Sequence, residues 1–522
     1  MRHGGGEVLV VEKQAVAGGS TGVSGGTLWI PDNPLMREDG VPDSPEEAAA
    51  YLEATVGDAG PSTSRARKEA FLSTGPIVVD FLRERGIRLV RSAGYSDYYD
   101  ERPGGNAEGR VLEAELLDRR ELGPLEDWVA PAVGPLVMYT REAAALSLMG
   151  RTRSSAATLA RVLARTARAR SSGRHLVGAG RALLGRMLIA CARAEVPIWR
   201  ATPLLGIVEE DGAVLGVVVR RGSREVRVRA RRGVLLATGG FAREPTMREA
   251  HSPGGVRTAW TAANPGDTGE AIRMAVALGA ATDLLDQAWW TPVSVRPDGT
   301  PAFAVWERGK PHAIIVDAGG RRFCNEAASY QDVAQAMLDG GTPPAWLVMD
   351  ARHRRRYLWG VTPPRARTKE WVATGYFKTG NSIEALADRI AVDPAALRGT
   401  VERFNGFAAS GRDSDFHRGE RAYDRYYGDP RVRPNPCLGA LEQAPFYAVA
   451  LYPGDTGTCG GLLTDADARV LRGDGRPIER LYATGNATAS VFGRSYPGSG
   501  ASIAASLVWG YRAARHALEH GA

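Results

Sequence analysis

The residues best suited to chemistry stand where short apolar segments end. Residues 7–13 (EVLVVEK) form a β-branched run closed by an acid, which is typical of a buried parallel strand. In dinucleotide-binding folds, an acid at such a strand end accepts hydrogen bonds from the adenosine ribose. A Gly- and Ser-rich loop over residues 17–26 follows, and its glycines let backbone pass close to a pyrophosphate. Glu12 and this loop therefore predict a dinucleotide site.

An apolar strand that runs into Ala-Thr-Gly occurs twice. Residues 234–240 read VLLATGG, and residues 481–486 read LYATGN. Such junctions are expected where two distant chain segments meet one cofactor at the carboxyl ends of parallel strands. The pattern predicts that both segments share the site that begins at Glu12.

Alternating strands and helices predict an α/β fold that positions these junctions. We expect a hairpin around Asp211-Gly212 and helices over residues 45–58, 64–85, 178–195, 268–280 and 501–518. From about residue 285 to 450 the composition shifts to more Trp, Tyr, Pro and Arg. We therefore expect a Rossmann-like cofactor-binding domain made of residues 1–285 and 453–522, with an α+β substrate domain, residues 286–452, inserted in it.

Composition and charge exclude several classes of protein. The chain has 522 residues and a net charge of +7, with 59 acidic residues interspersed among 66 basic ones. A nucleic-acid partner would need basic residues concentrated on one face, so we expect none. No apolar run approaches the roughly 20 residues of a membrane span, and the start lacks a secretory signal. Four widely spaced cysteines fit a reducing compartment and argue against a disulfide framework or a structural zinc site.

These features predict a cytoplasmic protein. The basic, Ala-rich residues 152–172 leave two interpretations open. They form either a solvated segment or a helix that lies on a membrane surface, which would make the protein peripheral at the membrane.

Several stretches give the chain a resemblance to a known family. The VVEK strand, the GGST…SGG loop and both Ala-Thr-Gly strands resemble the flavoproteins of the fumarate reductase/succinate dehydrogenase superfamily. Within it, residues 490–503 (SVFGRSYPGSGASI), 321–330 (RRFCNEAASY) and 25–31 (GGTLWIP) are most similar to the 3-ketosteroid Δ1-dehydrogenases. The resemblance covers nearly the whole chain. It implies FAD as the cofactor and an inserted substrate domain.

One departure from the superfamily concerns its opening strand and GxGxxG motif, which hold the FAD pyrophosphate. No such motif precedes Glu7. We therefore expect that the chain begins just before the second strand of the domain and lacks about 30 residues. The remaining cofactor-binding residues implied by the resemblance are Glu12, Lys13, Gly18, Gly19, Ser20, Thr21, Ser24, Gly25, Gly26, Ala237, Thr238, Gly239, Gly485, Asn486, Ala501, Ser502 and Ile503.

The resemblance also implies three catalytic tyrosines and a glycine. The family's reaction removes a proton and a hydride from adjacent carbons beside a ketone, and the hydride passes to flavin N5. Tyr496 and the backbone N–H of Gly500 would donate to the ketone oxygen. Tyr330 would take the proton, and Tyr98 would support it. The implied partners are a steroid or similar apolar ketone and an external electron acceptor.

Two alternatives stay open. A fumarate reductase-like enzyme binds a dicarboxylate, but its proton-donating arginine would stand at Tyr330, and its histidine before a Gly-Gly pair is replaced by Cys459. Arg494 is the one obvious cation within residues 490–503, the segment that the resemblance places near the flavin. The absent opening motif also leaves open an inactive flavoprotein fragment that serves as a binding protein. The retained tyrosines count against that interpretation.

Overall fold

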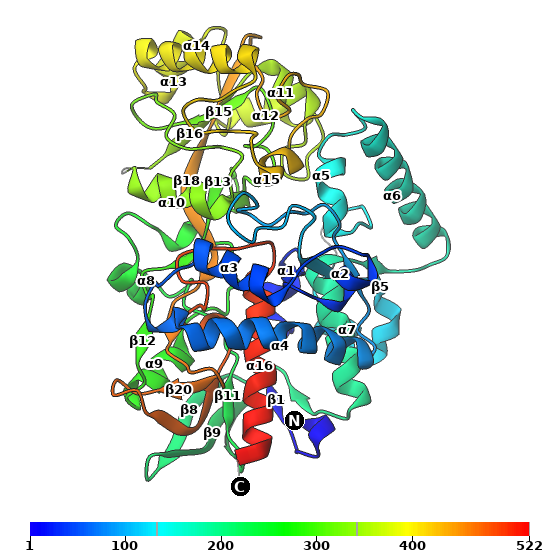
Figure 1. Ribbon diagram of the computed structural model, residues 1–522, viewed down its shortest axis with the longest axis vertical. Coiled ribbons are helices and arrows are strands. Elements are labelled where there is room, and N and C mark those ends of the chain that lie inside the picture. The colour runs from blue at the N-terminus through cyan, green and yellow to red at the C-terminus, as the bar shows by residue number, and fades with distance from the viewer. Residues whose placement is uncertain (132–133, 341–342, 521–522) are drawn as a thin grey trace.

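The computed structural model describes residues 1–131, 134–340 and 343–520. The molecule is elongated, with α13 (Ile383–Ile390) and α14 (Pro394–Ser410) at one end and both termini toward the other (Figure 1). None of the described helices is long and apolar enough to cross a membrane.

A six-stranded sheet lies toward the end that holds the termini. Its main order is β10–β9–β21–β11, while β8 pairs with β9 and β20 with β21. The predicted hairpin at Asp211-Gly212 is confirmed, because it joins β8 to β9. β11 and β21 run parallel, so their Ala-Thr-Gly segments leave the sheet together. The strands are β8 (Leu204–Glu210), β9 (Ala213–Arg221), β10 (Arg224–Arg229), β11 (Val234–Leu236), β20 (Arg469–Leu471) and β21 (Pro477–Ala483).

A separate parallel pair is formed by β1 (Val10–Val11) and β7 (Ile198–Trp199). β1 is shorter than the seven-residue run that predicted it. Among the described residues β1 pairs only with β7, and β11 only with β21, so each keeps one free edge. Glu7, just before β1, forms an ion pair with Arg231, just before β11.

A second six-stranded sheet occupies the middle of the molecule and its far half (Figure 1). Its order is β14–β13–β18–β16–β15, with β17 also on β18. The strands are β13 (Ala288–Val295), β14 (Pro301–Phe303), β15 (Ala313–Val316), β16 (Ala345–Met349), β17 (Lys378–Gly380) and β18 (Phe446–Thr458). Around it lie α10 (Tyr330–Asp339), α11 (Ala351–Arg356), α12 (Thr368–Ala373), α13, α14 and α15 (Ala422–Tyr426). The predicted boundaries of an inserted domain at 286 and 452 stay a prediction.

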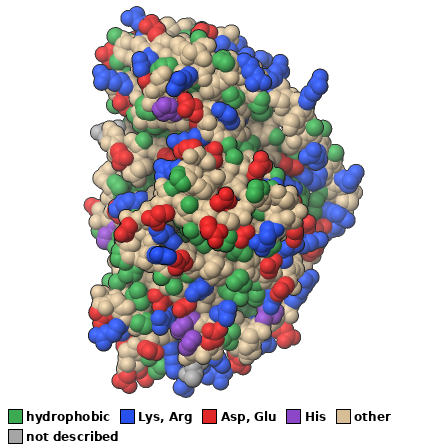
Figure 2. Space-filling view, in the orientation of Figure 1, with side chains coloured by type: hydrophobic (Ala, Val, Ile, Leu, Met, Phe, Trp, Pro, Cys, Tyr) green, Lys and Arg blue, Asp and Glu red, His purple; other side chains and the backbone are tan. Residues whose placement is uncertain are grey.

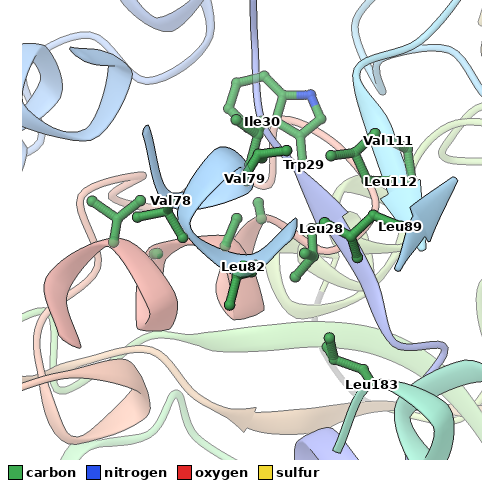
Figure 3. Packing of buried hydrophobic residues seen from close by; sticks show 14 of the residues in the cluster. Leu28, Trp29, Ile30, Val78, Val79, Leu82, Leu89, Val111, Leu112 and Leu183 are labelled. Carbon is green, nitrogen blue, oxygen red and sulfur yellow. The ribbon is translucent and has the colours of Figure 1, made fainter. Parts of the chain in front are cut away.

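The core nearest the candidate site lies where β2 (Thr27–Trp29) packs between α4 (Arg65–Glu84) and β4 (Val111–Ala114), as Figure 3 shows. Trp29 is fully buried, and its ring stacks on Phe71 at 6.1 Å and meets Phe492 edge-on at 5.9 Å. Aromatic rings of this size bury about 150–250 Å² each, so they dominate the local packing energy. α16 (Ala501–His520) contacts both α4 and β2 through its buried face. The core therefore fixes the start of α16.

The predicted helices are confirmed as α3 (Pro45–Thr55), α4, α7 (Ala179–Arg193), α9 (Glu270–Ala277) and α16. Residues 17–26, predicted as a loop, instead contain the short helix α1 (Gly19–Val23). Gly18 turns the chain with φ +100°, and the Ser24 side chain donates to the Thr21 carbonyl, so local bonds close the helical turn. The other elements are α2 (Pro34–Glu38), α5 (Ala143–Leu146), α6 (Arg153–Ser171), α8 (Pro245–His251), β3 (Leu89–Arg91), β5 (Leu117–Asp118), β6 (Leu176–Val177), β12 (Thr282–Asp283) and β19 (Gly461–Leu462).

Candidate active site

Three tyrosines from distant parts of the chain form one aromatic cluster. The ring centroid of Tyr98 lies 5.5 Å from that of Tyr330 and 5.8 Å from that of Tyr496, and Tyr330 and Tyr496 are 5.6 Å apart. Tyr98 and Tyr496 are buried, whereas Tyr330 is partly exposed. The structure thus brings together all three tyrosines that the sequence indicated.

Backbone and side-chain hydrogen bonds hold the loops that carry these rings. The Pro497 carbonyl accepts from the Tyr51 hydroxyl at 2.6 Å and from the Tyr98 N–H at 3.1 Å. The Tyr99 hydroxyl donates to Asp332, in the first turn of α10, at 2.7 Å. Ser329 caps that helix by accepting from the Asp332 N–H. The loop around Tyr98 is therefore tied both to the loop of Tyr496 and to the helix that begins with Tyr330.

Gly500 stands next to the cluster, directly before α16. Its φ of +91° lies in the left-handed region, and a Cβ there would sit 2.1 Å from the Thr27 carbonyl oxygen. Only glycine fits this position without a shift of backbone. The Tyr496 hydroxyl is 3.1 Å from the Ser502 Oγ in the first turn of α16. That hydroxyl thus lies at a helix N-terminus, where unpaired N–H groups favour negative charge.

Burial dominates the electrostatics of the cluster. It raises the pKa of Tyr98 and Tyr330 well above the usual value of 10. The neighbouring phenols reinforce the shift at Tyr98, whereas at Tyr330 the phenol of Tyr496 reinforces it and hydrogen bonding to Tyr98 opposes it. Burial also raises the pKa of Tyr496, although its hydrogen bond with Ser502 opposes the shift. Among the described residues the Tyr98 hydroxyl is buried without a hydrogen-bond partner in good geometry. The phenols are therefore neutral at pH 7, and a site of neutral donors suits an uncharged carbonyl better than a carboxylate.

Sequence reasoning missed two aromatic neighbours of these tyrosines. Tyr423 lies 4.5 Å from Tyr98, and Trp289 lies 4.9 Å from Tyr496, centroid to centroid. Trp289 also donates from Nε1 to the Asn486 side chain at 3.0 Å. The second tyrosine-rich run of the sequence, residues 422–427 (AYDRYY), was the available signal for Tyr423.

The later cofactor-binding candidates lie around the two parallel strands and α16. Ala237 and Thr238 are exposed at the end of β11, and Gly239 and Gly485 have φ values of +74° and +65°. A small cavity lies between the segment after β21 and α16. It is lined by Trp289, Gly485, Asn486, Thr488, Ser490, Val491, Ser502, Ala505 and Trp509. The structure thus joins the residues predicted at 485–486 to Ser502, which neighbours Ala501 and Ile503 in the first turn of the helix.

The early candidates form a second group beside β1. The Glu12 carboxylate accepts from the Gln14 N–H at 2.8 Å, and burial raises its pKa. Lys13 Nζ lies 2.7 Å from the Glu270 carboxylate, so its charge is already paired within the protein. Ser20 contacts Asp267, a residue that sequence reasoning missed and whose pKa burial raises to about 7.

The glycines and hydroxyls of residues 18–26 serve close packing and local turns. A Cβ on Gly26 would lie 2.2 Å from the Gly180 backbone nitrogen, and one on Gly18 would meet the side chain of Leu184 at 2.3 Å. Ser24 Oγ accepts from the Gly26 N–H at 3.0 Å, and the Gly25 carbonyl accepts from Thr140. Thr21 and Gly19 lie within α1. A direct contact of these residues with the cofactor stays a prediction.

Comparison with known proteins decides the family. A family model described as an FAD binding domain matches residues 1–503. The chain belongs to this family of FAD-binding flavoproteins. FAD is accordingly its cofactor, as the resemblance implied.

Relatives within the family include enzymes of ring ketones. The 3-oxosteroid 1-dehydrogenase of Mycolicibacterium smegmatis is 40% identical over 98% of this chain and 93% of its own. The 4-oxocyclohexanecarboxylate 2-dehydrogenase of Sinomonas cyclohexanicum is 36% identical over 97% of this chain and 88% of its own. A crystal structure of 3-ketosteroid Δ1-dehydrogenase from Sterolibacterium denitrificans, in complex with 1,4-androstadiene-3,17-dione, matches with a TM-score of 0.93. It is 36% identical and covers 99% of this chain and 96% of that one.

The residues around the two strand ends fit FAD. The exposed residues Ala237 and Thr238 and the positive-φ glycines allow close approach of a planar ring or a phosphate. The Glu12 carboxylate, which accepts from backbone N–H groups, could also accept from ribose hydroxyls, and the N-terminus of α16 favours negative charge on a reduced flavin.

Proposed function

We propose that this protein is an FAD-dependent dehydrogenase that introduces a double bond beside the ketone of a 3-ketosteroid or a similar apolar ring ketone. One observation carries the proposal, namely the meeting of Tyr98, Tyr330 and Tyr496 beside Gly500 at the start of α16. In the part of the chain that the structure describes, no lysine or arginine side chain stacks on these three rings. The relatives named for 3-oxosteroid and 4-oxocyclohexanecarboxylate substrates support dehydrogenation of a ring ketone, and the oxosteroid enzyme supports an apolar one.

The ketone oxygen would be held by the Tyr496 hydroxyl and the Gly500 N–H. Both donors are fixed before substrate arrives, since Pro497 anchors the loop and Gly500 is packed against Thr27. Donors aimed at an oxygen that gains charge in the transition state stabilise it without reorganisation. This arrangement would acidify the C–H bond next to the carbonyl.

Tyr330 would remove that proton. Its neutral phenol is no base, so the step begins from the phenolate, whose oxygen takes the proton while the C–H electron pair forms the enolate. The Tyr98 hydroxyl, which has no well-formed hydrogen bond within the described ranges, would donate to the Tyr330 oxygen and stabilise its charged form. FAD, when bound, supplies the hydride acceptor, and an external electron acceptor would reoxidise it.

Substrate selectivity tests the proposal against the fumarate reductase-like alternative. Arg494, the cation such a site would need, already pairs with Asp286 at 2.7 Å. FAD-loaded protein should reduce an artificial electron acceptor with a 3-ketosteroid and should be inactive with succinate and fumarate. Activity with the diacids alone would overturn the assignment, and flavin binding without any turnover would favour the inactive-flavoprotein alternative.

We further infer that the FAD-binding sheet takes one more parallel strand between β1 and β11. Val10 and Leu235 are 39% and 41% exposed, and both strands have a free edge among the described residues. The ion pair between Glu7 and Arg231 shows that β1 and β11 start no farther apart than two side chains can span. Lys13, just after β1, contacts Glu270 in α9. A strand lies about 4.8 Å from each neighbour, so one strand would satisfy both edges.

The flavin content of two purified proteins tests this inference. One is the 522-residue chain, and the other carries additional residues ahead of Met1, translated from the upstream reading frame. The extended protein should retain more FAD after gel filtration, because a glycine turn and a helix N-terminus would then hold the pyrophosphate. Equal flavin content would defeat the inference.

A further inference from the structure

Tyr51 joins the two loops that carry the proposed catalytic phenols. It stands in α3 and is fully buried. Its hydroxyl donates to the Pro497 carbonyl at 2.6 Å and accepts from the Tyr99 N–H at 3.3 Å. We propose that Tyr51 is a positioning residue that fixes the loop of Tyr496 relative to the loop of Tyr98, and so the ketone donor relative to the base. This inference rests on the proposed function.

The hydrogen bonds of Tyr51 form a closed link between the loops. The Pro497 carbonyl also accepts from the Tyr98 N–H at 3.1 Å, so the loops meet directly beside the Tyr51 hydroxyl. Burial and the nearby Asp97 carboxylate raise the pKa of Tyr51 well above its usual value of 10. The hydroxyl therefore keeps the proton that it donates to the Pro497 carbonyl.

A buried ion group holds Tyr51 against the first of these loops. Arg110 pairs with Asp43, just before α3, at 2.6 Å and with Asp97, in the loop, at 2.7 Å. Its guanidinium lies 5.3 Å from the Tyr51 ring centroid. The charged side chains seen in Figure 2 are scattered over the surface, whereas these three are at most 1% exposed. A buried ion group adds little net stability but can fix one arrangement of the segments that it joins.

Trp29 packs against both loops as well. Its Nε1 donates to Asp97 at 2.7 Å, and its ring centroid lies 5.9 Å from that of Tyr51. A Cβ on Gly498 would lie 2.1 Å from the Trp29 ring, so a larger residue would push the Pro497 loop away. Trp29 is itself held in the core of Figure 3. Both loops thus rest on one rigid support, and the Tyr51 hydroxyl sets where they meet.

The placement of one loop relative to the other matters most in the transition state. The ketone donor acts on the carbonyl oxygen and the base acts on the neighbouring carbon, so both must be aligned with one substrate at the same moment. A ketone can still bind to its donor when the base is displaced. Loss of the alignment should therefore lower kcat and change KM little, because the interactions that are lost belong to the transition state.

Kinetics of FAD-loaded Tyr51→Phe test the proposal, since this change removes the hydroxyl and keeps the ring. With a 3-ketosteroid, kcat should fall about 10–100-fold, because a displacement of about 1 Å can cost that much. KM and FAD content should change little. The double variant Tyr51→Phe/Tyr496→Phe should lose less activity than the product of the two single losses, because Tyr51 acts through the loop of Tyr496. Unchanged kcat in Tyr51→Phe, or independent losses in the double variant, would overturn the proposal.

The matched control is Tyr357→Phe. Tyr357 is also buried, and its hydroxyl donates to Asp429 at 2.7 Å, a bond that involves neither loop. Thermal melts should show that both variants fold with similar losses of stability, and kcat should fall only in Tyr51→Phe. An equal fall of kcat in both variants would reduce the effect to lost stability and overturn the proposal.

Hydrogen exchange measures the link between the loops without turnover. In Tyr51→Phe, the amides of residues 95–102 and 492–501 should exchange about fivefold faster, since the loss of one ordinary hydrogen bond eases local opening by about that factor. Tyr357→Phe should leave both segments unchanged. Faster exchange in residues 95–102 alone would overturn the proposal, because the Tyr99 amide loses its acceptor in any case. If the parent does not oxidise the ketosteroid, the proposed function fails, and the exchange of residues 492–501 still decides whether Tyr51 links the loops.

Discussion

The two Ala-Thr-Gly segments leave adjacent parallel strands, yet their surroundings differ sharply. β21 ends in a closed environment, where Ala483 is fully buried and Thr484 is 6% exposed. β11 ends at a free edge, where Leu235 is 41% exposed and Ala237 and Thr238 are open to solvent. The same Ala-Thr-Gly sequence is thus buried after β21 and exposed to solvent after β11.

The contrast extends to the whole candidate site. The tyrosine side is fixed by hydrogen bonds to Pro497 and Asp332 and by the tight packing of Gly500. The β1–β11 side exposes apolar strand edges that nothing in the described chain covers. The tyrosine side is therefore fixed in advance, whereas the β1–β11 side keeps open strand edges. Variants on the two sides should separate catalysis from cofactor retention and stability.

The largest expected effect is on the tyrosine side. Tyr330→Phe removes the proposed base and keeps the ring, so kcat should fall about 10²–10⁴-fold while FAD content stays unchanged. Burial raises the pKa of Tyr330, and a base works only when deprotonated. The parent's kcat/KM should therefore rise with pH into the alkaline range, and the variant should lose this rise. Steady-state kinetics across pH measure both.

A matched hydroxyl deletion controls for packing. Tyr423→Phe alters a ring that contacts Tyr98 and lies in the same cluster, and it should keep near-normal turnover. If Tyr330→Phe behaved like Tyr423→Phe, Tyr330 would be a wall of the pocket. The base would then have to be sought among Tyr95, Tyr98 and Tyr99.

Tyr496→Phe should have the next largest effect and a different kinetic signature. It removes one donor to the ketone oxygen, which costs roughly 10²–10³ in kcat in well-studied oxyanion sites. The ketone is polar before reaction too, so substrate binding should also weaken and KM should rise. Stopped-flow flavin reduction would separate the two effects. A normal rate of flavin reduction at saturating ketone would remove Tyr496 from this role.

Sequence alone predicted the elements well because most of them follow periodic patterns. The helices α3, α4, α7, α9 and α16 repeat their apolar residues at helical spacing, and the hairpin turns at Asp211-Gly212. The helix α1 was missed because short-range bonds of Ser24 and the turn at Gly18, rather than periodicity, form it.

The site was predicted less completely, for a related reason. Tyr98, Tyr330 and Tyr496 came from a family resemblance, which local patterns do not provide. Tyr423, Trp289 and Asp267 join the site through tertiary contacts across more than 150 residues, as in the bond of Trp289 to Asn486. No local spacing predicts such a contact.

A pair of leucines on neighbouring strands tests the contrast between the two strand ends directly. Leu481→Ala on β21 deletes a fully buried side chain and should lower the free energy of unfolding by about 2–5 kcal/mol. Leu235→Ala on β11 removes a half-exposed one and should cost less than about 1 kcal/mol in flavin-free protein. Urea unfolding with and without FAD measures both. Equal costs without FAD would show that the β11 edge is not open in solution.

The smallest expected effect concerns Tyr98, whose buried hydroxyl has no hydrogen bond of good geometry in the part of the chain that the structure describes. Leaving such a group unpaired costs on the order of 1–3 kcal/mol, so Tyr98→Phe should keep the free energy of unfolding or raise it by about 1 kcal/mol. If the hydroxyl donates to the Tyr330 phenolate, the same change should lower kcat about tenfold and move the alkaline rise in kcat/KM to higher pH. Chemical unfolding and pH profiles of Tyr98→Phe should therefore show a free energy of unfolding that is kept or raised and a kcat that is lowered. If Tyr98→Phe lowered the free energy of unfolding and left the pH dependence of kcat/KM unchanged, the hydroxyl would serve packing. It would then have no effect on the pKa of Tyr330.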